Sequence, residues 1–125
     1  MNCIFCLISP DKYLAENEYF FAIRDIHPIT KGHSLIISKR HTPDFFTLQP
    51  EEMTALLEMS RIMRNLLDEE LHPEAYNLLM NCGSAAHQSI FHFHLHFIPR
   101  YHKDGLSLRA INEKLRSIAF FFFSI

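Results

Sequence analysis

The chain has 125 residues, of which 48% are hydrophobic and 21% are charged, and this composition fits one compact domain with a core and argues against disorder. A formal net charge of −2 gives no electrostatic reason to expect a nucleic-acid partner. Three cysteines behind an N-terminus that does not resemble a secretory leader argue against a disulfide framework. We expect a single domain over residues 1–125, located in the cytoplasm and without membrane contact.

The order of the predicted elements indicates the fold class. In chain order we expect strands at 19–23 and 34–38, a helix from Pro50 to His72, a strand at 76–81, a histidine-rich strand at 90–98 and a helix at 108–119. This order predicts an α+β fold with an antiparallel sheet and two helices. The apolar run 118–125 is too short to span a membrane, and we expect it to pack on a sheet or a partner subunit. A role at a membrane surface or in binding another partner is the alternative.

The long helix carries both a start signal and an apolar stripe. Pro50 suits the first helical position, and two glutamates follow it at the positive end of the helix dipole. The stripe at helical spacing comprises Met53, Leu56, Leu57, Ser60, Met63 and Leu67. We expect this stripe to form part of the core.

Three histidines alternate with apolar residues in the run from Phe91 to Phe97. In a strand, successive side chains point to opposite faces, so His92, His94 and His96 would line one face. We expect Pro99 to end this strand. Such a row of imidazoles can bind a metal, or it can attack and hold a phosphate.

The chemistry of a phosphate site fits these residue types. A neutral imidazole is a nucleophile at pH 7, and crowded imidazoles lower one another's pKa. His94 is flanked on both sides, so its ring can be held in one tautomer. Backbone N–H groups of the small-residue loop 81–86 can stabilise phosphoryl charge, and Gln88 and Ser89 can bond phosphate oxygens or guide a proton.

Other polar residues allow two interpretations each. Asp25 follows an apolar strand and is either a ribose-binding carboxylate or an ordinary loop carboxylate. His33 is either a buried histidine or a neighbour of the histidine row, and Asn81 either forms a turn or orients groups of the site. Cys3 and Cys6 are spaced as in zinc sites, although two buried cysteines would look the same.

The ordered set of motifs resembles the histidine triad family. The motif His92-Phe-His94-Leu-His96-Phe-Ile is similar to the family's pattern of three histidines alternating with apolar residues. Further matches follow the same order as in the family. They are the segment Phe21 to Asp25, the strand Gly32-His33 to His41, the loop Asn81-x-Gly83 with Gln88-Ser89, and Pro99-Arg100.

The resemblance implies a homodimer with a shared sheet that acts on the α-phosphate of a purine nucleotide. The implied catalytic residues are His94 as nucleophile with His92, His96, His33 and Ser89. The implied substrate-binding residues are Asp25, Asn81, Gly83, His87 and Gln88. Zinc-carrying members place metal ligands at positions that correspond to Cys3, Cys6, His41 and His92, which predicts a structural zinc ion.

The expectation for His87 and the choice of substrate complete the predictions from the sequence. His87 stands where many members have glycine, and we expect it to contact the leaving group. The substrate is either a nucleoside phosphoramidate or a dinucleoside polyphosphate. The alternatives are a non-catalytic, zinc-stabilised module that binds AMP, and a hydrolase whose triad holds catalytic zinc.

Overall fold

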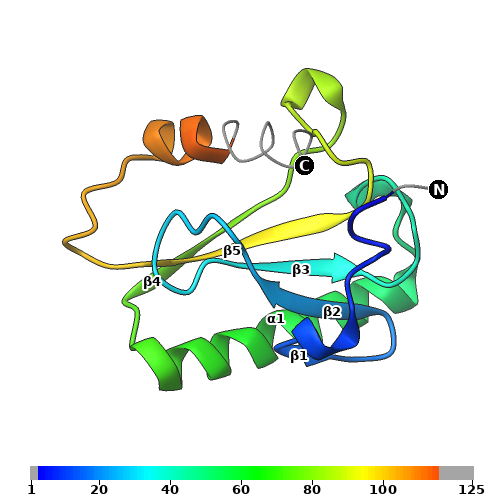
Figure 1. Ribbon diagram of the computed structural model, residues 1–125, viewed down its shortest axis with the longest axis horizontal. Helices are drawn as coiled ribbons and strands as arrows, with labels where there is room; N and C mark the ends of the chain where they lie inside the picture. Colours follow the sequence, from blue (N-terminus) through cyan, green and yellow to red (C-terminus); the bar gives the residue numbers. More distant parts are fainter. Residues whose placement is uncertain (1–2, 116–125) are drawn as a thin grey trace.

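A five-stranded antiparallel sheet forms the centre of the protein in the computed structural model, which describes residues 3–115 (Figure 1). The strands lie in the order β1-β2-β3-β5-β4. Their bounds are Ala15–Glu16 for β1, Phe20–Arg24 for β2, Ser34–Ser38 for β3, Ala75–Leu79 for β4 and His94–Arg100 for β5. Three short 3-10 turns lie at Pro10–Lys12, Phe45–Thr47 and Ser84–Ala86. The predicted α+β class with an antiparallel sheet is confirmed.

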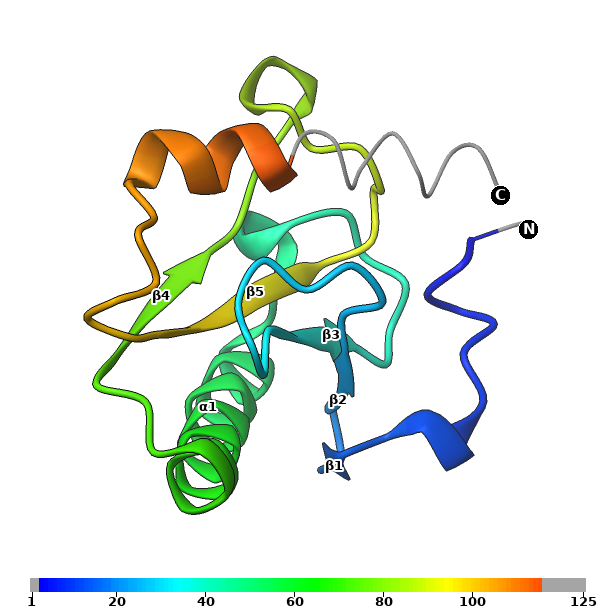
Figure 2. The ribbon, with the colours of Figure 1, turned by 60° about the vertical axis from the view of Figure 1, so that its left-hand side comes forward.

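The two faces of the sheet are covered by different parts of the chain. Helix α1, Pro50–Leu71, packs across one face, and the N-terminal segment and the helical residues 108–115 lie on the other side (Figures 1 and 2). The core against α1 includes Phe93, Leu95 and Phe97. The intervening residues His94 and His96 therefore face the N-terminal segment, as the alternation predicts.

The histidine strand begins later and ends later than predicted. Strand β5 starts at His94, so Phe91 and His92 lie before it, and the Phe91 side chain is 50% exposed. Pro99 lies within β5 and pairs with Tyr76 of β4, so the prediction that it ends the strand was wrong. The pairing of β5 with β3 stops at Phe97, so the missing N–H of Pro99 interrupts no hydrogen bond to β3.

Helix α1 begins at Pro50, as expected from the sequence, and ends at Leu71, next to the predicted end at His72. His72 caps it in the left-handed conformation. The buried residues of α1 are Glu52, Leu56, Met59, Met63 and Leu67. The predicted stripe was wrong at Leu57, which is exposed, at Met53, which lies at the margin of exposure, and at Ser60, which is half-buried and bonds the carbonyl of Leu56. The stripe missed Met59 and Glu52. The 3.6-residue period is compatible with more than one set of residues on the buried face of α1. The packing of α1 against β2 and β5 determines which set is buried.

Two expectations concern the C-terminus. The predicted final helix is present over residues 108–115, where Ile111 and Leu115 pack against Ile98 of β5. The remainder of that prediction, and the expected packing of the run 118–125, lie outside the described residues. Within the described part of the chain, no helix combines the length and hydropathy that crossing a membrane requires.

Gly32 is needed at the turn before β3 for two reasons. Its φ of +91° is rarely adopted by other residues, and a Cβ built there would lie 2.5 Å from Leu71 Cδ1 and 3.2 Å from Pro99 Cγ. We expect Gly32→Ala to lower the free energy of unfolding by about 2–4 kcal/mol, from backbone strain and overpacking together. Urea unfolding measures this loss.

Gly83→Ala is the matched control, because Gly83 also has a positive φ of +96° but would place its Cβ in open space. The control should lose only the strain contribution. Equal losses in the two variants would contradict the close packing of Gly32 against Leu71.

Candidate functional site

The histidine row lies beside the N-terminal segment. Phe5 is buried there, and its ring centroid lies 4.9 Å from that of His94 and 5.8 Å from that of His92. The rings of His94 and His96 are 5.4 Å apart. Phe5 of the N-terminal segment thus packs against the imidazoles of the histidine row.

The hydrogen bond of His94 determines its tautomer. Nδ1 of His94 lies 2.8 Å from the carbonyl oxygen of His92. A carbonyl only accepts, so Nδ1 carries the proton and Nε2 of the neutral ring has a free lone pair. Burial lowers the pKa of His94, which favours this neutral form. The sequence predicts a held tautomer, and the carbonyl that holds it comes from the preceding histidine.

A second chain of bonds orients His96. The backbone N–H of Ile29 donates to His33 Nδ1 at 3.1 Å, so His33 carries its proton on Nε2. That N–H lies 3.0 Å from His96 Nδ1, which must accept it. His96 therefore carries its own proton on Nε2. Burial lowers the pKa of His33 to about 4, and burial together with the neighbouring imidazoles holds the pKa of His96 well below its usual range.

Asp25 is fully buried next to this chain. Its Oδ1 accepts from the backbone N–H of His27 at 2.9 Å, and its Oδ2 lies 3.5 Å from His33 Nε2. Oδ2 has no hydrogen-bond partner among the described residues, and burial raises the pKa of Asp25 to about 6. A buried carboxylate oxygen without a partner is suited to receive a donor from a ligand.

Four potential zinc ligands converge near the C-terminal end of β3, where the histidine row begins. Cys6 Sγ lies 3.2 Å from His41 Nδ1 and 3.5 Å from His92 Nδ1, and Cys3 Sγ lies 3.4 Å from His92 Nδ1. The two Nδ1 atoms are 3.1 Å apart. In a tetrahedral zinc site, sulfur and nitrogen ligands are about 3.5 Å apart and two nitrogens about 3.4 Å apart. The four residues therefore fit zinc.

The tautomer of His92 supports the same conclusion. Nε2 of His92 donates to the carbonyl of Ser38 at 2.7 Å, which leaves Nδ1 unprotonated and directed at the two thiols. A ligating histidine commonly bonds a backbone carbonyl through its other nitrogen.

Asp25, His33 and His96 also place three potential ligand atoms close together. This group does not fit a metal, because the N–H of Ile29 already occupies His33 Nδ1 and the proton on Nε2 blocks the second nitrogen. The described structure therefore gives no support to a metal ion held by Asp25, His33 and His96.

The loop between β4 and β5 carries the other predicted residues. The side chain of Gln88 accepts from the N–H of Gly83 at 2.7 Å and donates to the carbonyls of Pro43 and Ile90. Gln88 thus holds the loop in place, a role that sequence reasoning missed. Asn81 and Ser89 are half-buried, and His87 is exposed.

His87 adopts a left-handed conformation with φ +67°. Glycine adopts such a conformation without steric cost, which gives a physical reason for glycine at this position in the family pattern.

An apolar cavity of about 490 Å³ adjoins the histidine row at Phe5. Asp25 lies at its wall, and the apolar lining includes Ile4, Phe5, Ile8, Ile23, Ile26 and Leu35. Sequence reasoning missed this cavity. The signal available was the apolar composition of residues 4–8 around the second cysteine, which is unusual for an exposed terminus.

The comparisons with known proteins agree with this arrangement. A family model described as HIT domain matches residues 8–103. Adenylylsulfatase HINT3 of Arabidopsis thaliana is 38% identical over 122 residues, which cover 91% of this chain but only 62% of the plant protein. Adenosine 5′-monophosphoramidase hnt1 of Schizosaccharomyces pombe is 36% identical over 108 residues, which cover 83% of this chain and 78% of the yeast protein.

A solved structure is similar over the whole length. A zinc-bound histidine triad family protein from Mycobacterium smegmatis has a TM-score of 0.76 and 35% identity, and the alignment covers 99% of this chain and 97% of that one. This chain belongs to the histidine triad family, as its motifs indicate.

The buried carboxyl of Asp25 predicts a pH dependence of stability. Its pKa is about 6 when folded and about 3.9 when unfolded. Ionisation of Asp25 therefore leaves the free energy of unfolding unchanged below about pH 4, lowers it as the pH rises from about 4 to 6, and lowers it no further above about pH 6. We expect the stability of Asp25→Asn relative to wild type to increase over this window by about 2–3 kcal/mol, at 1.36 kcal/mol per pKa unit. Urea unfolding at several pH values measures the difference.

His33 Nε2 lies 3.5 Å from Asp25 Oδ2, so the difference between the two proteins includes the coupling of His33 to the carboxyl. Asp11→Asn, which removes an exposed carboxylate, is the control. A difference between Asp25→Asn and wild type that does not vary with pH would contradict the burial of an ionisable Asp25.

Proposed function

We propose that the protein is a nucleotide hydrolase or nucleotidyltransferase that works through a nucleotidyl-His94 intermediate. The observation that carries the proposal is the tautomer of His94, whose Nδ1 donates to the carbonyl of His92 and whose Nε2 is left as a nucleophile. Beside it, His96 carries its proton on Nε2, because His96 Nδ1 accepts from His33. A nucleophile and a hydrogen-bond donor thus lie next to each other on one face of the sheet.

These tautomers suit a reaction in two steps, in which His94 is first modified and then released. In the first step, a bond forms between His94 Nε2 and the α-phosphorus, and the bond from phosphorus to the leaving group breaks as that group takes up a proton. The positive charge on the modified ring is stabilised by the carbonyl of His92. In the second step, water forms a bond to phosphorus, the bond to His94 breaks, and the water releases a proton. The N–H of His96 stabilises charge on the phosphoryl oxygens in both steps.

The cavity beside Phe5 supports a nucleoside as the non-leaving part of the substrate. Its apolar walls fit a purine base, and Asp25 at the wall has an unpartnered carboxylate oxygen for the ribose hydroxyls. The names of two relatives describe cleavage of adenylyl sulfate and of an adenosine phosphoramidate. These names favour a small adenylyl derivative, such as a nucleoside phosphoramidate, over a dinucleoside polyphosphate.

The loop that carries Gly83 and His87 supports the leaving-group side of the site. The backbone N–H groups of Gly83, Ala86, His87 and Gln88 donate within the loop. The other backbone N–H groups of the loop and the side chains of Asn81, Ser89 and Gln88 are our candidates for orienting phosphate oxygens and protons. Gln88 would act through the loop it holds. The exposed His87 would contact the leaving group, where the protonated imidazole can donate a proton.

Zinc at Cys3, Cys6, His41 and His92 is part of the proposal as a structural ion. Bound there, it would link the N-terminal segment to the sheet, because the two thiols lie on either side of Phe5 and the two imidazoles belong to other parts of the chain. Cys82 lies apart from this group. The free thiols suit a reducing compartment such as the cytoplasm, which we retain as a proposal.

A homodimer is the proposed assembly. Strand β4 is an edge strand, and its Leu78 is 47% exposed, so its outer backbone groups and apolar side chains are available to a second copy. A groove of about 710 Å³ between α1 and β4 continues this surface and is lined by Leu57, Tyr76 and Phe97 among others.

His94→Ala tests the mechanism directly. We expect it to retain the fold and AMP binding but to lower kcat by about a thousandfold or more, because it removes the nucleophile. Turnover of adenosine phosphoramidate and adenylyl sulfate, followed by mass spectrometry, measures this loss. Acid-labile label from a single turnover should map to His94 in the wild type.

His102→Ala is the control for loss of a histidine, since the His102 side chain is highly exposed and pairs with Glu74. Turnover of His94→Ala near the wild-type rate would disprove the mechanism. Tight AMP binding by a wild-type protein that turns over none of these substrates would favour the alternative, a non-catalytic AMP-binding module.

Cys3→Ser tests the zinc site. The wild type should contain about one zinc per chain, as expected for one closed four-ligand site, and the variant should lose the metal and melt at a lower temperature. Elemental analysis and thermal unfolding measure the two effects. Cys82→Ser is the matched control and should retain the metal, whereas a wild type that lacks zinc when purified without chelator would refute the site.

A further inference from the structure

The two histidines of the zinc group are held in different ways. The ring of His92 is buried and fixed by its bond to the Ser38 carbonyl. His41 is exposed, and no hydrogen bond to its Nε2 is present among residues 3–115. The position of the His41 imidazole therefore depends on the backbone to either side of it.

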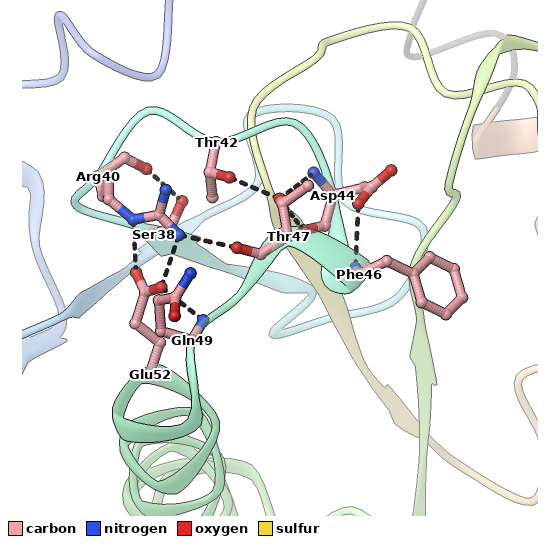
Figure 3. A network of polar contacts seen from close by, with 8 residues as sticks. All are labelled: Ser38, Arg40, Thr42, Asp44, Phe46, Thr47, Gln49 and Glu52. Atoms are coloured by element: carbon pink, nitrogen blue, oxygen red, sulfur yellow. Dashed lines mark hydrogen bonds and ion pairs between the residues drawn. The ribbon is translucent and has the colours of Figure 1, made fainter.

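An ion pair between the exposed Arg40 and the buried Glu52 fixes the residue before His41. Arg40 Nη2 lies 2.7 Å from Glu52 Oε1, and Arg40 Nε lies 3.2 Å from Glu52 Oε2 (Figure 3). The same guanidinium donates to the carbonyl of Thr47 at 2.9 Å, and the carbonyl of Arg40 accepts from the Ser38 hydroxyl at 2.8 Å. Five donors in a planar fork allow arginine to make these contacts together.

The residue after His41 is fixed as well. Thr42 is buried, its carbonyl accepts from the N–H of Phe93 at 2.7 Å, and its hydroxyl meets that of Thr47 (Figure 3). Phe93 lies between His92 and His94. The segment that carries His41 is thus joined both to the histidine row and, through Arg40, to helix α1.

Glu52 is an unusual residue for the buried face of a helix. Only 3% of it is exposed, and its Oε1 also accepts from the N–H of Gln49 at 2.8 Å, which caps α1. Burying a carboxylate is costly unless it is paired and hydrogen-bonded. Capping alone does not require the ion pair, since an exposed glutamate caps equally well. The ion pair with Arg40 also joins the first turn of α1 to the segment that carries His41.

We propose that the Arg40–Glu52 ion pair is the positioning element for the zinc ligand His41. It joins the segment on which His41 lies to the first turn of the longest helix, so the imidazole is already directed at Cys6 before a metal arrives. A ligand ordered in advance loses less conformational entropy on binding, and the affinity for the metal rises accordingly. The inference rests on the zinc site proposed above.

Glu52→Gln tests this inference with little damage to the fold. Glutamine retains an acceptor for the N–H of Gln49, so the cap persists, but the charge that holds Arg40 is lost. We expect the dissociation constant for zinc to rise about tenfold, the lower end of the range for groups that orient metal ligands. Competition against a chromophoric zinc chelator measures the constant.

Lys39→Ala is the matched control, because Lys39 is adjacent in sequence and pairs with Glu16 on the surface. It should bind zinc as the wild type does. Arg40→Ala should weaken zinc binding at least as much as Glu52→Gln, and the double variant should be no weaker than Arg40→Ala, since both changes break one interaction. Arg40→Lys, which keeps the charge but loses the planar fork, should fall between wild type and Arg40→Ala.

A second readout separates positioning from general stabilisation. The tighter zinc binds the folded state, the more it raises the melting temperature. The increase in melting temperature on adding zinc should therefore be smaller in Glu52→Gln than in the wild type. An unchanged zinc-dependent increase, with a lower melting temperature with and without metal, would show a purely structural pair and overturn the inference. So would zinc constants in Glu52→Gln and Arg40→Ala equal to that of Lys39→Ala.

The failure of this inference is distinguishable from failure of the zinc site. A wild type that binds no zinc overturns both. A wild type that binds zinc and loses it in Cys3→Ser, while Glu52→Gln binds as tightly as wild type, overturns only the positioning role.

Discussion

The pairing of β5 with β3 is the constraint on which the site depends. Register places His94 opposite Ile37 and His96 opposite Leu35, so both imidazoles lie on the face away from α1. A shift of one residue would turn both histidines into the core and expose Phe93, Leu95 and Phe97. The apolar residues that pack under α1 thus hold the chemistry on the opposite face, and the stability of the core and the geometry of the site are inseparable.

Burial on that face controls the protonation of the imidazoles. Three of the rings are each bonded at one nitrogen to a backbone group: His92 and His94 donate to carbonyls, and His33 accepts from an N–H. These backbone groups cannot change their donor or acceptor character, whereas side-chain partners can. Low pKa values from burial keep the rings neutral, and the backbone decides which nitrogen is free.

Much of the architecture could be predicted because it follows from local patterns. Period-two alternation predicted the faces of β5, and Pro50 and His72-Pro73 predicted the ends of α1. The histidine row was identifiable from its alternation, and the resemblance to the histidine triad family implied the four candidate zinc ligands that the structure brings together. The predictions were wrong where a pattern permits two solutions, as at Leu57 and Met59 in α1, or where an exception depends on a neighbour, as at Pro99 beyond the end of β3.

The sequence by itself determined which residue types are available, the order of the elements and the face on which the histidines lie, because these depend on periodicity and on neighbours a few positions apart. Only the tertiary structure decided the tautomers, the burial of Asp25, the cavity beside Phe5 and the pairing of Arg40 with Glu52. Each of these depends on contact between segments that are distant in the chain or on the direction of one backbone carbonyl. No local pattern encodes such a contact, since the same residues would be equally compatible with other partners.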